Sequence, residues 1–224
     1  MNFAKTFFAG AAIACVAGSA SAATIVEYST VAGTSISANS NTAAEVSADD
    51  LVAGSGLTAQ FFSTFNHTDW DPASTTFEAA VAANDYWSWG FDVSDAVKID
   101  LTEMNIRLDR SGTGPDDVEI RAYVNGSTAG VSLFTYDYND GKNGVTTTGI
   151  DLSGIGALTQ GDSVEFVLAA FNSEASTGSF DLETVTWPGG TDSIQLVGDI
   201  SAVPEPASLA LLGLGGLAML RRRK

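Results

Sequence analysis

The stretch Met104-Asn105-Ile106-Arg107-Leu108-Asp109 alternates apolar and polar residues with a period of two. The stretch Val118-Glu119-Ile120-Arg121-Ala122-Tyr123 repeats the pattern a few residues later. Such alternation predicts antiparallel strands with one face toward a core and one toward water. Residues 111–117 join the two runs and are too rich in Gly, Pro and Asp for a regular element, so we expect a hairpin with a long connection.

More strands are expected in both directions from this pair. The predicted strands cover residues 86–93, 132–138, 146–152, 163–170, 179–186 and 193–200. Eight or more short strands in about 180 residues favour an all-β fold, a single antiparallel β-sandwich of jelly-roll type. Residues 77–83 form the one credible helix, and residues 32–58 are expected to be irregular or edge-forming.

Aromatic residues divide between the predicted core and possible ligand contacts. Trp87, Trp89 and Phe91 share one strand parity and are expected in the core. Sugar rings present apolar C–H faces that stack on flat side chains. Candidates for glycan contact are Trp70 and Trp187, in predicted loops, and Tyr123, on the polar face of its strand.

The charge of the chain is strongly negative, at −17 for 10 basic and 27 acidic residues. Half of the basic residues and only one acidic residue lie in two terminal segments, so the part between them carries −21. A field of this sign repels phosphate backbones and anionic lipids, which excludes nucleic-acid binding.

The N-terminus has the features of an export signal. One lysine precedes an apolar run of small residues, and Ala20 and Ala22 supply the small side chains that a signal peptidase accepts. We expect residues 1–22 to be removed after export through the Sec pathway, and residues 23–203 to form the extracellular domain.

The C-terminus combines an extended break, a short apolar helix and a basic stop. Pro204, Glu205 and Pro206 come first, and prolines hold that segment extended. The following helix is shorter than a bilayer core, and the basic cluster at its end should remain cytoplasmic. That cluster consists of Arg221, Arg222, Arg223 and Lys224. Residues 204–224 therefore predict a transient anchor in the inner membrane.

This tail resembles the PEP-CTERM sorting signal of Gram-negative bacteria. The resemblance implies that an exosortase recognises Pro204-Glu205-Pro206, removes the tail, and that the protein reaches the cell surface or extracellular matrix. Residues 48–57, 106–115 and 180–185 are similar to sandwich domains that precede such tails and have the shape of carbohydrate-binding modules. At Leu182-Glu183 the sequence departs from the Asp-Asn that many such modules carry.

Catalytic patterns are sparse in the sequence. His67 is the only histidine, no Gly-x-Ser-x-Gly elbow occurs, and the only cysteine, Cys15, falls in the export signal. A surface or capping position is expected for His67. No cofactor is required, but Asp137, Asn139 and Asp140 offer hard oxygens on one turn, where calcium is the natural cation.

The sequence therefore predicts a non-catalytic, acidic surface or matrix protein associated with extracellular polysaccharide in a biofilm. Two alternatives remain open. One is a carbohydrate-binding module with a defined glycan pocket, and the other is a secreted glycoside hydrolase or polysaccharide lyase, because paired carboxylates are common in the chain.

Overall fold

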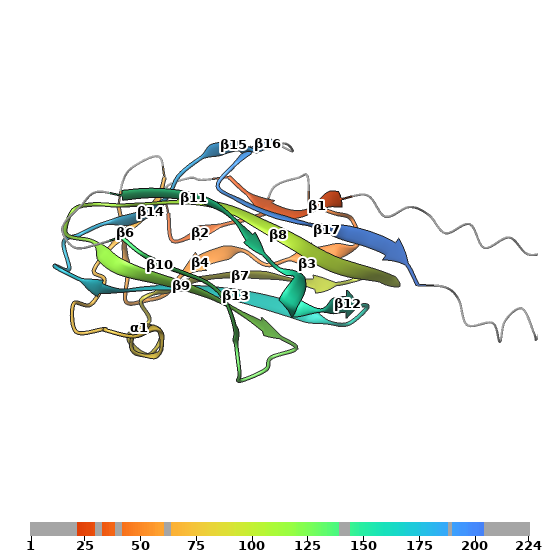
Figure 1. Ribbon diagram of the computed structural model, residues 1–224, viewed down its shortest axis with the longest axis horizontal. Coiled ribbons are helices and arrows are strands. Elements are labelled where there is room, and N and C mark those ends of the chain that lie inside the picture. The colour runs from red at the N-terminus through yellow and green to blue at the C-terminus, as the bar shows by residue number, and fades with distance from the viewer. Residues whose placement is uncertain are drawn as a thin grey trace, which may run out of the picture.

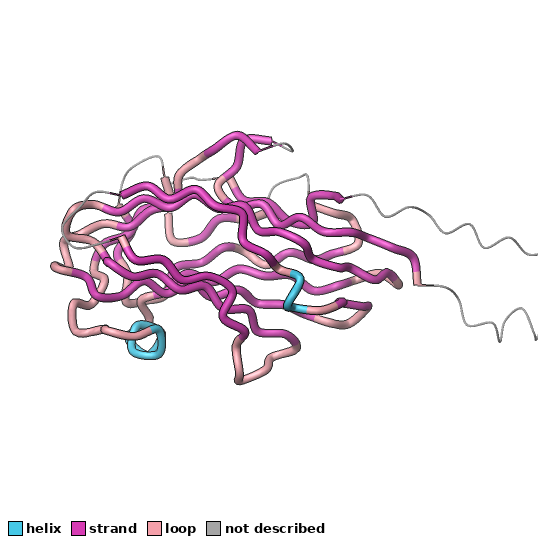
Figure 2. The backbone as a smooth tube through the Cα atoms, viewed as in Figure 1, coloured by secondary structure: helices cyan, strands magenta, loops and turns pink. Residues whose placement is uncertain are grey.

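The domain is a sandwich of two antiparallel β-sheets with a third, two-stranded ribbon at one side (Figure 1). The computed structural model describes residues 22–29, 33–38, 42–60, 64–138, 144–187 and 190–203. Strands dominate this part of the chain, and helix is confined to two short segments (Figure 2). The predicted fold class is confirmed.

The first sheet, sheet A, is built around the longest strand, β8. Its main path runs β1-β17-β8-β14-β6-β5, and β11 and β12 pair with β8 as well. The strands are β1 (Ala22–Tyr28), β5 (Thr58–Ala59), β6 (Phe65–Thr68), β8 (Val97–Arg110), β11 (Gly144–Asp151), β12 (Ala157–Thr159), β14 (Phe180–Leu182) and β17 (Ile194–Ala202).

The second sheet, sheet B, runs in the order β10-β9-β13-β7-β4-β2, and β3 also pairs with β7. The strands are β2 (Ser35–Ile36), β3 (Val46–Ala48), β4 (Leu51–Ala53), β7 (Tyr86–Val93), β9 (Pro115–Val124), β10 (Val131–Asp137) and β13 (Ser163–Ser173). The remaining elements are the ribbon strands β15 (Val185–Trp187) and β16 (Gly190–Asp192), the helix α1 (Phe77–Ala83) and a 3₁₀ turn at Ser153–Ile155.

The predicted hairpin between the two alternating runs is wrong. Both runs are strands, but β8 belongs to sheet A and β9 to sheet B, so residues 111–114 cross between the sheets. At this corner the buried Arg110 forms an ion pair with Asp116, and its guanidinium also donates to the carbonyls of Ser111 and Gly112. Alternation predicts which face of a strand is buried but not which strand it pairs with.

The core lies between the sheets and is rich in aromatic rings. Trp87, Trp89 and Phe91 are at most 1% exposed, as their shared parity predicts. Trp87 stacks on Phe180 of sheet A at a centroid distance of 5.2 Å. His67 lies in the same cluster and is fully buried, so its expected surface or capping position is wrong: the residue occupies an inward position of β6.

Helix α1 covers part of the outer face of sheet B. The Thr76 hydroxyl caps it by accepting from the Ala79 amide at 3.2 Å. The helix packs Phe77 and Ala80 against Val167 and Ala169 of β13. This contact buries one end of the outer face and leaves the other end open.

The first and last described strands lie side by side. β1 pairs with β17, with Ala22 opposite Asp199, and β17 is paired with β8 as far as Ala202. Ala22 and Val203 therefore lie at the same end of sheet A (Figure 1). The predicted signal cleavage point and the start of the sorting tail flank one end of the domain.

Candidate functional site

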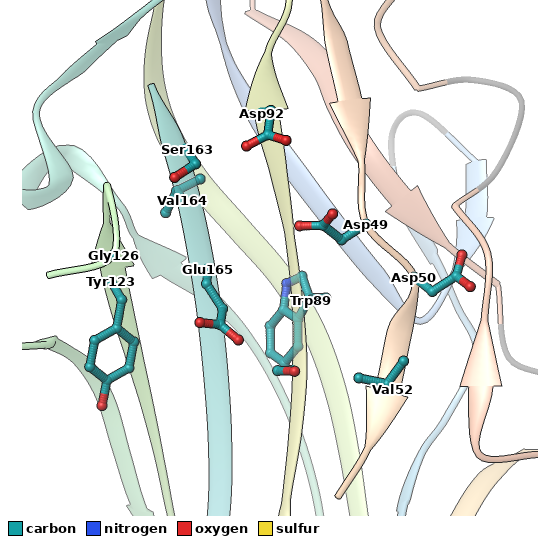
Figure 3. A pocket seen from close by; sticks show the side chains of 11 residues that line it. Asp49, Asp50, Val52, Trp89, Asp92, Tyr123, Gly126, Ser163, Val164 and Glu165 are labelled. Atoms are coloured by element: carbon teal, nitrogen blue, oxygen red, sulfur yellow. The ribbon is translucent and has the colours of Figure 1, made fainter. Parts of the chain in front are cut away.

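A groove lies on the outer face of sheet B, beyond the part that α1 covers. It has a volume of about 550 Å³. Its lining residues come from β7, β13 and β4, from β9 and the turn after it, and from the segment that joins β3 to β4. They are Asp49, Asp50, Val52, Ser88, Trp89, Asp92, Tyr123, Gly126, Ser163, Val164 and Glu165. The sheet order places these elements side by side, and Figure 3 shows Tyr123 on one side of Glu165 and the aspartates on the other.

Carboxylates dominate the groove. Asp49, Asp50, Asp92 and Glu165 are exposed. Partial burial, followed by the charges of Asp92 and Asp50, raises the pKa of Asp49. The Tyr28 hydroxyl donates to the Asp49 carbonyl at 2.6 Å and so holds this wall against the core. The groove therefore offers several hydrogen-bond acceptors and repels anionic ligands.

Tyr123 supplies the half-exposed aromatic ring of the groove. It lies opposite Glu165 in the pairing of β9 with β13. Its ring also packs against the cluster below α1, and Gly130 lies so close that a Cβ there would come within 2.7 Å of ring atoms. Contacts on these sides fix the ring position, as a stacking surface for a sugar requires.

The other two aromatic candidates do not contribute to this groove. Trp70 is fully buried, packs on Trp87 and Phe180, and donates its Nε1 hydrogen to the His67 carbonyl at 2.9 Å. Its prediction as a glycan contact is wrong, because the loop turns the indole into the core. Trp187 is the last residue of β15, and its side chain lies outside the described residues.

The predicted calcium site is only partly within the described structure. Asp137 is exposed at the end of β10, opposite Asp117 of β9, whereas Asn139 and Asp140 lie outside the described residues. Among the residues that are described, no three His, Cys, Asp or Glu side chains are placed to share a metal ion.

Sequence reasoning missed most of the groove. Only Tyr123 stood out, because it is aromatic on a polar strand face. Asp49, Asp92 and Glu165 were inconspicuous among 27 acidic residues, and the two aspartates reach the groove through pairing of β3 with β7. The strand parity of Glu165 gives its face, but only sheet order brings it beside Tyr123.

The C-terminal end of the chain matches a known sorting motif. The family model of the PEP-CTERM protein-sorting motif matches residues 202–224. The chain carries a PEP-CTERM sorting motif. This motif marks an exported protein that is processed at the membrane by an exosortase.

Most predicted sorting residues lie beyond the part of the chain that the structure describes. These are Ala20 in the export signal, Pro204, Glu205 and Pro206 in the PEP-CTERM motif, and Arg221, Arg222, Arg223 and Lys224 at its end. Within the described ranges, no helix is both long and apolar enough to cross a membrane.

Comparison with solved structures finds family 29 carbohydrate-binding modules. A mutant of CBM29-2 has a TM-score of 0.37 at 9% identity, covering 84% of this chain and 99% of its own. CBM29_1 from Piromyces equi has a TM-score of 0.36 at 13% identity, covering 80% and 91%. These similarities are low, so the architecture rests on the sheets described above. Comparison with curated proteins finds no match.

Proposed function

We propose that this exported PEP-CTERM protein is a non-catalytic surface or matrix protein whose groove on sheet B binds extracellular polysaccharide. The observation that carries the proposal is Tyr123, held half-exposed beside Glu165 and facing Asp49 and Asp92 across the groove. An aromatic ring for stacking and carboxylates that accept from hydroxyls are the groups that bind sugars.

The charge of the groove favours neutral glycans. Four carboxylates line it, and the lining residues include no Lys or Arg. An anionic polysaccharide would meet repulsion at every sugar, whereas a neutral glucan or mannan would donate its hydroxyls to Asp49, Asp92 and Glu165. The proposed locations are the cell surface or matrix of a Gram-negative bacterium, reached through the Sec pathway.

The test is retention of the purified chain on neutral and anionic polysaccharide gels. Tyr123→Ala should lower affinity for the neutral gel by about 5- to 30-fold, because loss of one stacking contact costs on the order of 1–2 kcal/mol. Tyr136→Ala is the matched control, since Tyr136 is 40% exposed on β10 and does not line the groove. Equal retention of both variants, or stronger binding to the anionic gel, would overturn the proposed site.

Catalysis is measured in the same samples. A non-catalytic protein releases neither reducing ends nor unsaturated sugars during long incubation with the polysaccharide it binds. Release of either product in proportion to protein, and its loss in Glu165→Gln, would assign the groove to a hydrolase or lyase instead.

A further inference from the structure

Oxygen-bearing side chains form a row across three strands on the outer face of sheet A, on the opposite side of the molecule from the groove. Asn66 of β6 is paired with Asp181 of β14, and Asp181 is paired with Asp109 of β8. Facing residues of adjacent antiparallel strands have Cβ atoms about 4.5–5.5 Å apart. The neighbouring residues Phe180 and Leu182 point into the core, so this row points outward.

The row is largely removed from water. Asn66 and Asp181 are each 8% exposed, and the Oδ1 atom of Asn66 has no hydrogen-bond partner among the described residues. A buried acceptor without a donor costs free energy, and native structures rarely leave one. The Asn66 oxygen therefore points to a missing donor or cation beside Asp181.

Positive charge near the two aspartates is already engaged. Arg107 lies two residues before Asp109 on the same strand face, but its Nε donates to Glu183 at 3.0 Å. Within the described ranges, no ion pair of 4.0 Å or less reaches Asp109 or Asp181. The pair thus brings two carboxylates together without a close ion-pair partner in the described part of the chain.

Burial and neighbouring charges shift the pKa values of Asp181 and Asp109. Burial, then the charges of Asp109 and Glu183, raises the pKa of Asp181 to about 7, against an opposing hydrogen bond from Thr64. Burial and Glu183 also raise the pKa of Asp109, and Arg107 opposes this shift. The pairing of β14 with β8 brings these carboxylates together, and a cation between them would offset their repulsion.

We propose that Asp109, Asp181 and Asn66 bind a calcium ion. Calcium takes six to eight hard oxygen ligands, and two carboxylates with one amide oxygen supply three or more, which water completes. Two negative charges match the charge of the ion, and the site would satisfy the orphaned Asn66 oxygen. The ion would join β6, β14 and β8, three strands distant in sequence, and so stabilise sheet A.

The test is the unfolding temperature of the purified full chain in calcium and in chelator. At calcium tenfold above the dissociation constant, the midpoint should rise by about 3–5 °C. Asp181→Asn and Asp109→Asn should abolish the rise and fold at least as stably as wild type in chelator, because each removes the carboxylate repulsion. Asp137→Asn should keep the rise.

Equilibrium dialysis provides the direct measurement, with one calcium expected per wild-type chain and none per Asp181→Asn chain. A midpoint indifferent to calcium would show that a shared proton, not a metal, occupies the row. A rise lost in Asp137→Asn but kept in Asp181→Asn would place the ion at the end of β10 and overturn the proposal.

Discussion

His67 should make the domain sensitive to mild acid, and replacing it should remove that sensitivity. The His67 side chain is fully buried among aromatic rings. The distance between ring centroids is 4.5 Å to Phe65 and 5.7 Å to Trp87. Neither ring nitrogen has a hydrogen-bond partner of good geometry among the described residues, and the Gly33 backbone acts only as a weak one. Burial lowers the pKa of His67 to about 4, and the nearby Gly33 backbone only partly opposes this shift.

The sign and size of the effect follow from linkage. The unfolded histidine has a pKa near 6.5, so between pH 6.5 and 4 the unfolded chain binds the extra proton and stability falls as pH falls. A shift from 6.5 to about 4 costs on the order of 2 kcal/mol between pH 7 and pH 5. Asp181 acts in the opposite direction, because its raised pKa favours the folded state at lower pH.

The comparison of wild type with His67→Leu isolates the histidine, since both chains carry Asp181. Urea unfolding, followed by tryptophan fluorescence at pH 7 and pH 5, gives both free energies. Both pH values lie above the pI of about 4.1, where low net charge promotes precipitation. The leucine variant should gain about 2 kcal/mol relative to wild type as the pH falls from 7 to 5. An unchanged difference between the two chains would refute a buried, neutral His67.

Three more perturbations test other parts of the molecule. Arg110→Ala should cost about 3–5 kcal/mol of unfolding free energy in denaturant titration, because it removes the cationic partner of the buried Asp116 carboxylate; a loss below about 1 kcal/mol would show that this ion pair does not stabilise the fold. Thr76→Ala should cost about 1 kcal/mol by removing the cap on the Ala79 amide, whereas Thr76→Ser should be nearly neutral. Glu205→Ala should leave a tail-bearing form in the inner membrane, measured by fractionation and mass; normal maturation would show that the motif is not read at this residue.

Local sequence patterns predict many of the strands and the helix. The helix α1 and the strand β7 have the bounds that the sequence predicts, because Thr76 offers a cap and the tryptophans alternate toward the core. Which strands pair with each other is harder to predict from the sequence. Arg110 shares the parity of the apolar residues before it, and Asp116 lies in the predicted loop, but neither position predicts the buried ion pair that they form where the chain changes sheets. Long-range pairing decides this, and one sequence shows only local periodicity.

The residues of the candidate groove were harder still to predict from the sequence. Tyr123 could be found from its parity, whereas Trp70 could not be excluded, because a tryptophan before Asp-Pro looks like a loop residue and only the fold turns it inward. The partners of Tyr123 come from segments about 40 and 75 residues away in the chain, and no local signal links Glu165 or Asp49 to it.

The position of β17 determines how the domain bears mechanical load. β17 lies between β1 and β8 and leads directly to Val203, the last residue before Pro204-Glu205-Pro206. Inter-strand hydrogen bonds of antiparallel pairs run perpendicular to the strands. A pull through the tail while it is anchored therefore runs along β17 and shears both ladders at once, instead of opening them one bond after another. Drag on a bound polymer at sheet B would be resisted by the strand that connects the domain to its membrane tail.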